Sequence, residues 1–244
     1  MSEVKLVALD MDGTLLNMDE EVTDYTKQVI TQALDKGIHV VLSTGRWLQS
    51  CYPYAETLNL SSYLVTCNGG EIWTMKKELL EQHLLDASTV EKMWQLGEEI
   101  GVKMWMISTE NVYHGERPED FFQHRWLKFG CDSFDKDKLD RMVKELSYMN
   151  GLELTNSLPT NIEVNPKGVS KASALKKVCR ELGITMDHVM AVGDSLNDIK
   201  MIQEAGVGVA MGNAQDAIKK VANYVTDTNN NNGVAKAIER FVLS

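Results

Sequence analysis

Short apolar runs alternate with helix-length segments in the first and last thirds of the chain, and this rhythm restricts the possible folds more than any other feature. Such runs are typical of strands buried on both faces of a parallel sheet. In the first third, Gly37 stands where a glycine would end the first helix. The predicted strands are Val4–Leu9, Ile38–Leu42 and Tyr63–Thr66, and the predicted helices are Thr23–Lys36 and a stretch that ends at Leu58. Strand–helix–strand repeats predict a parallel sheet with crossover helices.

The last third repeats this rhythm. Its predicted helices are Lys171–Leu182, Leu196–Glu204, Ala214–Val221 and Gly233–Val242, and its predicted strands are Val189–Val192, Val207–Ala210 and Asn223–Val225. The asparagine run Asn229–Asn232 precedes the last of these helices and is interpreted as an exposed loop or a helix N-cap region. We therefore expect the two ends of the chain to form one sheet together.

The middle of the chain breaks the rhythm. Its predicted helices are Ser88–Ile100, Phe121–Lys128 and Lys136–Met149, and its predicted strands are Val102–Ile107, Leu152–Thr155 and Asn161–Val164. We expect residues 83–165 to form a second α/β domain inserted into a core made of residues 1–82 and 166–244. The tryptophans Trp94, Trp105 and Trp126 lie in the insert, where packing in a small domain is favoured over stacking on a substrate.

Composition excludes several classes of protein. Hydrophobic residues make up 43% of the chain and charged residues 25%, which is typical of a globular domain rather than of collagen or a disordered tail. The net charge is −10 and no block of lysine or arginine occurs, which argues against a nucleic-acid partner or a polybasic membrane patch. The four cysteines form no CxxC pair, which disfavours a zinc site or a redox dithiol.

The N-terminal residues lack a basic segment followed by a long apolar stretch, so no signal peptide is expected. No apolar run approaches the length of a membrane helix. Together with widely spaced cysteines, which fit free thiols, these features predict a cytoplasmic protein without a membrane partner.

Polar clusters follow four of the predicted strands. They are Asp10-x-Asp12-Gly-Thr14, Thr44-Gly45-Arg46, Asn68-Gly-Gly and Gly193-Asp194-x-x-Asn197-Asp198. Ligands of open parallel sheets bind outside the carboxyl ends of the strands, so these clusters are predicted to converge on one crevice. A single aspartate at a strand end usually caps the next helix, but two aspartates two residues apart followed by Gly-Thr are much less common.

Asp10, Asp12, Asp194 and Asp198 would bring four negative charges into that crevice. Each close pair of like charges repels by roughly 4 kcal/mol at an effective dielectric constant near 20. Several of these carboxyls are therefore protonated or a cation binds them, and an all-oxygen ligand set points to a hard ion such as Mg²⁺. A calcium-binding EF-hand is excluded because the aspartates are dispersed along the chain.

Two further sites are suited to phosphate. Thr44 and Gly45 offer a hydroxyl and a backbone N–H at a strand-to-helix turn, where the helix dipole favours anions. Lys171 begins the helix after the insert and could neutralise both a phosphoryl group and an aspartate. Local sequence alone equally allows Lys171 to be a solvated lysine in the first helical turn.

These residues, in this order, resemble the haloacid dehalogenase-like phosphohydrolases, and within them the Cof-type phosphatases with a large α/β (C2B-type) cap. The four family motifs correspond to Asp10-Met-Asp-Gly-Thr-Leu-Leu16, Thr44, Lys171 in Gly-Val-Ser-Lys, and Gly193-Asp-Ser-Leu-Asn-Asp198. The resemblance covers the whole chain and implies a Rossmann-like, doubly wound core with residues 83–165 as the cap. The chain is short for the group, which implies a trimmed cap, and Trp47 after Thr-Gly-Arg is unusual.

The resemblance also implies roles for the site residues. Asp10 would be the nucleophile that forms an aspartyl-phosphate, and Asp12 the general acid and base, for which its pKa would have to rise. The implied ligands of Mg²⁺ are the Asp10 side chain, the Asp12 main-chain carbonyl and Asp194. The implied phosphoryl-binding groups are Met11, Thr44, Gly45, Lys171 and Asn197. Asp198 is expected to orient Lys171 or the waters of the metal, and Arg46 and Asn68 are expected to cap a helix or fix a loop as much as to contact a ligand.

The predicted function is the Mg²⁺-dependent hydrolysis of a small phosphorylated metabolite, such as a sugar phosphate. Two alternatives remain at this stage: a phosphomutase or phosphotransferase of the same fold, and a non-catalytic protein that binds phosphorylated metabolites. The second aspartate, Asp12, argues against the non-catalytic alternative, because simple binding does not need it. The polar stretch Tyr113–Arg117 is interpreted as a solvated loop rather than as part of the site.

Overall fold

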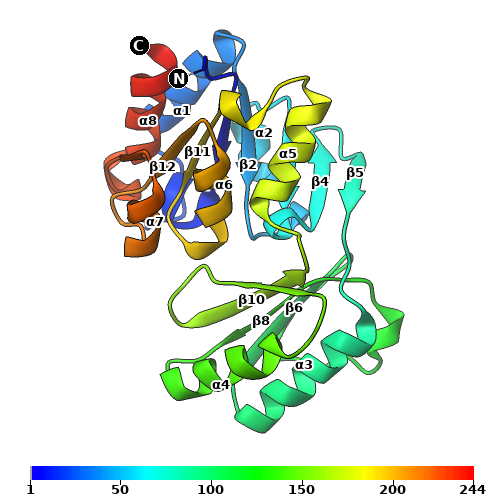
Figure 1. Ribbon diagram of the computed structural model, residues 1–244. Helices are drawn as coiled ribbons and strands as arrows, with labels where there is room; N and C mark the ends of the chain where they lie inside the picture. Colours follow the sequence, from blue (N-terminus) through cyan, green and yellow to red (C-terminus); the bar gives the residue numbers. More distant parts are fainter. Residues whose placement is uncertain (1) are drawn as a thin grey trace. The chain divides into compact units, whose positions relative to one another are not determined.

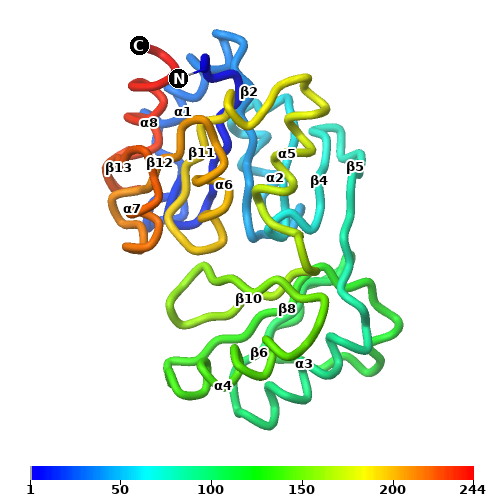
Figure 2. Tube along the Cα trace, in the orientation of Figure 1, coloured from blue at the N-terminus to red at the C-terminus, as the bar shows by residue number. Residues whose placement is uncertain are grey.

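A computed structural model describes residues 2–244 and divides them into two compact units (Figure 1). The first unit comprises the chain up to Glu81 and from Lys171 onward, and the second comprises Gln82–Ser170. The chain leaves the first unit after strand β5 and returns to it at helix α5, as the Cα trace shows (Figure 2). Within residues 2–244, no helix combines the length and the apolar character needed to cross a membrane.

The first unit is built on an eight-stranded sheet with the order β13-β12-β11-β1-β2-β3-β4-β5. The strands are β1 (Leu6–Leu9), β2 (His39–Ser43), β3 (Tyr63–Thr66), β4 (Glu71–Thr74), β5 (Leu79–Gln82), β11 (Val189–Gly193), β12 (Val207–Ala210) and β13 (Tyr224–Val225). All neighbours from β13 to β3 run parallel, and β4 runs antiparallel to β3. The sheet therefore joins both ends of the chain, with β1 between β11 and β2.

Helices cover both faces of this sheet and produce the mixed α/β class that the strand–helix rhythm predicts. They are α1 (Asp24–Asp35), α2 (Leu48–Thr57), α5 (Lys171–Glu181), α6 (Ile199–Glu204), α7 (Asp216–Val221) and α8 (Gly233–Ile238). Figure 1 shows α5 and α6 in front of the sheet and α1 behind it. The side chains of β1 are fully buried on both faces, as expected of a central parallel strand.

The second unit has a separate core and a five-stranded antiparallel sheet of order β7-β6-β8-β10-β9. Its elements are α3 (Ala87–Ile100), β6 (Lys103–Ser108), β7 (Val112–His114), β8 (Trp126–Asp132), α4 (Lys136–Ser147), β9 (Leu152–Thr155) and β10 (Asn161–Pro166). Alternate residues such as Met104, Met106, Phe129 and Val164 pack in the core with α3 and α4. Successive side chains of a strand point to opposite faces, so the intervening residues lie on the other face.

The predicted helix Phe121–Lys128 is wrong. A single helical turn, Phe121–Gln123, is followed by strand β8, which lies in the middle of the sheet between β6 and β10. Nearly all of β8 is buried, Lys128 included, so its residues do not alternate between apolar and polar in the way that indicates a strand. The strands β4, β5 and β7, of three or four residues each, are not among the strands predicted from the sequence.

Candidate active site

The loop after β1 carries the first aspartate pair. Asp10 donates its backbone N–H to the carbonyl of Val192 in the neighbouring strand, at 3.0 Å. One wide helical turn, Met11–Leu15, follows and is closed by a bond from the N–H of Leu16 to the carbonyl of Met11, at 2.9 Å. Gly13 has φ +76°, and a Cβ atom at this position would lie 2.6 Å from Oδ2 of Asp194. A glycine is therefore required for the loop to pass this aspartate.

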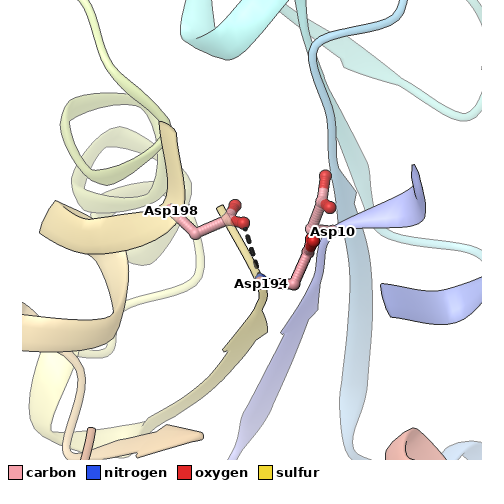
Figure 3. Close-up of side chains that lie close together, drawn as sticks. All are labelled: Asp10, Asp194 and Asp198. Atoms are coloured by element: carbon pink, nitrogen blue, oxygen red, sulfur yellow. Dashed lines mark hydrogen bonds between the residues drawn. The ribbon is translucent and has the colours of Figure 1, made fainter. Parts of the chain in front are cut away.

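Three carboxylates meet at the carboxyl ends of β1 and β11. Asp10, Asp194 and Asp198 each contribute an oxygen, and these oxygens all lie within 4.8 Å of one another (Figure 3). Thr14 donates its hydroxyl to Oδ1 of Asp194 at 3.1 Å. Asp198 accepts the backbone N–H of Asp194 at 3.0 Å and that of Ser195 at 3.1 Å, so it also fixes the turn that follows β11.

Lys171 lies at the centre of this cluster. It is the first residue of α5 and is fully buried, and its Nζ lies 2.6 Å from Oδ1 of Asp10 and 2.7 Å from Oδ1 of Asp198. Burial alone would lower the pKa of Lys171, but the negative charges of Asp10 and Asp198 raise it above its usual range. The ammonium group therefore stays charged, and a solvated role for this lysine is excluded.

One ammonium group does not balance three carboxylates. Burial, followed by the charge of Asp198, raises the pKa of Asp10 well above its usual range, although Lys171 opposes the shift. Burial and the same neighbour raise the pKa of Asp194 to about 6. Because crowded carboxylates resist ionisation without a cation, this all-oxygen set fits a hard divalent ion such as Mg²⁺.

The fourth predicted carboxylate does not join the cluster. The side chain of Asp12 forms a bidentate ion pair with Arg46, whose Nη2 and Nε lie 2.6 Å from Oδ1 and 2.9 Å from Oδ2 of Asp12. The expectation that four aspartate side chains crowd together is therefore corrected to three. Asp12 and Arg46 each belong to a motif that predicted a site, but the sequence did not predict an ion pair between them.

The turns after β2 and β3 adjoin one another. Thr44 is buried, donates its backbone N–H to the carbonyl of Val65, and accepts the N–H of Arg46 on its hydroxyl at 3.1 Å. Gly45 lies between the two residues in this turn. Asn68, in a left-handed conformation with φ 58°, donates its N–H to the carbonyl of Thr44. This bond joins the turn after β3 to the turn after β2.

Asn197 links the turns after β3 and β11. Its Nδ2 donates to Oδ1 of Asn68 at 3.3 Å. Its own Oδ1 is buried and, among the described residues, accepts no hydrogen bond. Buried acceptors are rarely left unpaired, so this oxygen is suited to accept a hydrogen bond from a bound group, and only Nδ2 can donate to a phosphoryl oxygen.

The sequence matches the family of haloacid dehalogenase-like hydrolases over residues 7–129 and 116–238. A 5-amino-6-(5-phospho-D-ribitylamino)uracil phosphatase of Bacillus subtilis is 52% identical, over 99% of this chain and 97% of the relative. A phosphoglycolate phosphatase of Methanobrevibacter smithii is 32% identical, over 98% and 99%. A solved haloacid dehalogenase-like hydrolase from B. subtilis superposes with a TM-score of 0.90 at 28% identity and covers 98% of this chain and all of its own.

The fold and the sequence matches define a phosphatase built on a mixed α/β fold. The chain belongs to the haloacid dehalogenase-like hydrolases, which confirms the predicted family, fold class and enzyme class.

Proposed function

We propose that this enzyme hydrolyses the phosphate monoester of a small metabolite through an aspartyl-phosphate on Asp10. The observation that carries this proposal is the buried contact of Lys171 with Asp10 and Asp198, with Asp194 beside them. When a cation offsets the effect of burial and of neighbouring carboxylates, an aspartate is ionised at neutral pH and needs no activating base. A buried ammonium group also offsets the repulsion between this carboxylate and a phosphate dianion.

In the first half-reaction, an oxygen of Asp10 attacks phosphorus and the bond from phosphorus to the ester oxygen breaks. Asp12 gives its proton to that departing oxygen. In the second half-reaction, a water molecule attacks the phosphorus of the aspartyl-phosphate and Asp12 takes the proton of this water. The products are an alcohol and inorganic phosphate, and Asp10 is restored. Asp12 must release at least one of its contacts with Arg46 to do this.

The phosphoryl oxygens would be held by groups at four strand ends. These are the N–H of Met11, the Thr44 hydroxyl, Gly45, the Lys171 ammonium group and the Asn197 amide. The side chains of Asp10 and Asp194 and the main-chain carbonyl of Asp12 would hold Mg²⁺, which when bound supplies positive charge against the phosphoryl oxygens. Asp198 would position Lys171, because it accepts a hydrogen bond from this ammonium group.

We propose 5-amino-6-(5-phospho-D-ribitylamino)uracil as the first substrate to test, because the phosphatase named for it is 52% identical over nearly the whole chain. Residues 83–165 would act as the cap that selects among cytoplasmic phosphorylated metabolites. The second unit, with a core of its own, supports a separate role for this segment.

Release of inorganic phosphate tests the proposal. The full chain is assayed with this compound, with sugar phosphates and with phosphoglycolate, each with Mg²⁺ and with excess chelator, and Asp10→Asn serves as the inactive control. We expect metal-dependent release from at least one compound. An isomeric sugar phosphate in place of free phosphate would identify a phosphomutase, and binding without turnover would identify a non-catalytic protein.

A further inference from the structure

The loop that carries Asp12 is held from outside by asparagine side chains. Asn213 donates its amide Nδ2 to the carbonyl of Gly13 at 2.7 Å, and Asn229 donates its Nδ2 to the carbonyl of Leu16 at 2.8 Å. One residue further along the chain, Asn230 accepts the backbone N–H of Met18 at 2.9 Å. The wide turn Met11–Leu15 is therefore held at its middle residue, Gly13, and just beyond its end, at Leu16.

The two donors are themselves connected. Oδ1 of Asn213 accepts the backbone N–H of Asn229 at 3.0 Å, so the turns after β12 and β13 form one support. This support, Asn213 with Asn229, is called the asparagine clamp below. It extends from the carbonyl of Leu16 through both asparagines to the carbonyl of Gly13.

Asparagine suits this position for a chemical reason. Backbone carbonyls accept hydrogen bonds only, and a side-chain amide has both a donor and an acceptor. Asn213 uses both: its Nδ2 binds Gly13 and its Oδ1 binds Asn229. Aspartate would keep the acceptor and lose the donor, and would face a carbonyl oxygen with a negative charge.

The clamp acts on the part of the loop that begins at Asp12. Asp10 is fixed separately, through its N–H to Val192 and its carboxylate to Lys171. Gly13 follows Asp12 directly, so a displaced Gly13 carbonyl would move the backbone of Asp12. Arg46 holds the carboxylate of Asp12, and the clamp holds its peptide chain.

We propose that Asn213 and Asn229 are positioning residues that fix the backbone of Asp12 for proton transfer. The proposal rests on the proposed function, because it assigns Asp12 the proton transfers of both half-reactions. It identifies the asparagine run as a support of the active-site loop as well as the start of the last helix.

Hydrogen exchange tests the contact without any assay of activity. The variants are N213D and N229D, which remove the donated bond and add a negative charge beside the carbonyl, and N213A and N229A, which remove the side-chain amide without adding charge. N231D is the matched control, because the side-chain amide of Asn231 donates to the hydroxyl of Thr228 at 3.0 Å, in its own turn. We expect the Leu16 amide to exchange about tenfold faster in the four clamp variants, since its opening free energy falls when its turn loses a donor. In N231D this amide is expected to exchange as in the natural chain.

Kinetics then separate positioning from general damage. Release of p-nitrophenolate in the first turnover needs no proton from Asp12, because this group leaves as an anion. We expect this first release to change less than about threefold in the clamp variants, and steady-state turnover of an alkyl phosphate to fall about tenfold or more, as losses of general acid–base catalysis do. With p-nitrophenyl phosphate the same variants should accumulate aspartyl-phosphate, because its formation needs no proton from Asp12 and its hydrolysis needs Asp12 as the base.

The outcomes are distinguishable. Leu16 exchange and turnover equal to those of N231D would overturn the clamp, as would equal losses in first release and steady-state turnover. Variants that no longer fold would assign both amides to the fold and would also overturn the proposal. No phosphate release by the natural chain would instead overturn the proposed function, and the exchange experiment would still report on the contact.

Discussion

Arg46 and Asp12 form a bidentate ion pair that joins the turn after β2 to the loop after β1. The guanidinium group of Arg46 also lies over the ring of Tyr54, 5.6 Å from its centre. A planar guanidinium fork matches both oxygens of a carboxylate, whereas a lysine ammonium group is a single point charge. Arg46 therefore fixes the direction of the Asp12 carboxylate.

Substitution of Arg46 should reduce catalysis more than stability. More than half of the Asp12 side chain is exposed, so we expect R46Q to lower the free energy of unfolding by only about 1 kcal/mol. We expect the kcat for an alkyl phosphate to fall about tenfold, because the general acid loses its orientation. R46K keeps the positive charge but not the planar guanidinium fork, so its kcat should lie between those of R46Q and the natural enzyme. Urea unfolding and steady-state kinetics measure both effects, and an R46Q variant with unchanged kcat would contradict this role.

Asp10→Asn should abolish turnover in a folded protein. An amide is nearly identical in shape to the carboxylate but does not attack phosphorus, and Lys171 keeps its contact with Asp198. Phosphate release and circular dichroism are the measurements. Activity within about tenfold of the natural enzyme would refute Asp10 as the nucleophile, because loss of a nucleophile costs several orders of magnitude.

Magnesium should bind to the carboxylate cluster and stabilise the first unit. A ligand that binds only the folded state raises the melting temperature, so we expect Mg²⁺ to raise it in the natural chain and to have little effect in Asp194→Asn. Activity should need Mg²⁺, and Ca²⁺ should replace it poorly because Ca²⁺ accepts more ligands at longer distances. Thermal unfolding and phosphate release are measured with each ion. Full activity in excess chelator would contradict this site.

The parts of the site that lie directly after buried strands could be predicted from the sequence. Asp10, Thr44, Asn68 and Asp194 each follow an apolar run, and parallel pairing brings the ends of these runs to one edge of the sheet. The pattern carries this information because strand–helix–strand crossovers make neighbouring strands parallel, so their carboxyl ends lie at the same edge. The contact of Lys171 with the cluster followed only from the family resemblance, since local sequence left a solvated lysine equally possible.

The remaining contacts leave no pattern in the sequence. The Arg46–Asp12 pair depends on the rotamers of two side chains 34 positions apart, and Asn213 binds a backbone carbonyl 200 positions away. The predicted helix Phe121–Lys128 overlaps the start of β8, whose identity depends on pairing with β6 and β10, which are distant in sequence. Tertiary contacts of this kind override local propensity.

In the second unit, removal of one partner of a buried ion pair should be strongly destabilising. Lys128 and Glu163 are almost fully buried, with Nζ of Lys128 3.0 Å from Oε2 of Glu163, and Ser157 donates to the other carboxylate oxygen at 3.0 Å. We expect K128M to destabilise the protein by about 3–5 kcal/mol, since it leaves the buried carboxylate without its cation. The double variant K128M/E163M should be more stable than K128M alone.

As the control, K136M breaks the exposed Lys136–Asp140 pair and should cost less than about 0.5 kcal/mol. Urea unfolding of these variants and the natural chain measures the losses of stability. Equal losses in K128M and K136M would contradict the prediction.

Asp132 should make the stability of the second unit depend on pH. Burial raises the pKa of Asp132 above its ordinary value, while its hydrogen bond from Trp105 and the charge of Lys103 partly oppose the shift. Because the folded-state pKa lies above that of the unfolded chain, the folded state binds more protons between these two values. Stability that is present below the unfolded pKa, about 3.9, is therefore lost as pH rises through the folded pKa.

The side-chain amide of the variant Asp132→Asn does not titrate, so we expect the urea midpoint of this variant to fall less over this range than that of the natural chain. The midpoints are compared at pH intervals from about 3.5 to 7, around the ordinary aspartate pKa. Parallel curves for the two proteins would show that Asp132 does not carry this pH dependence.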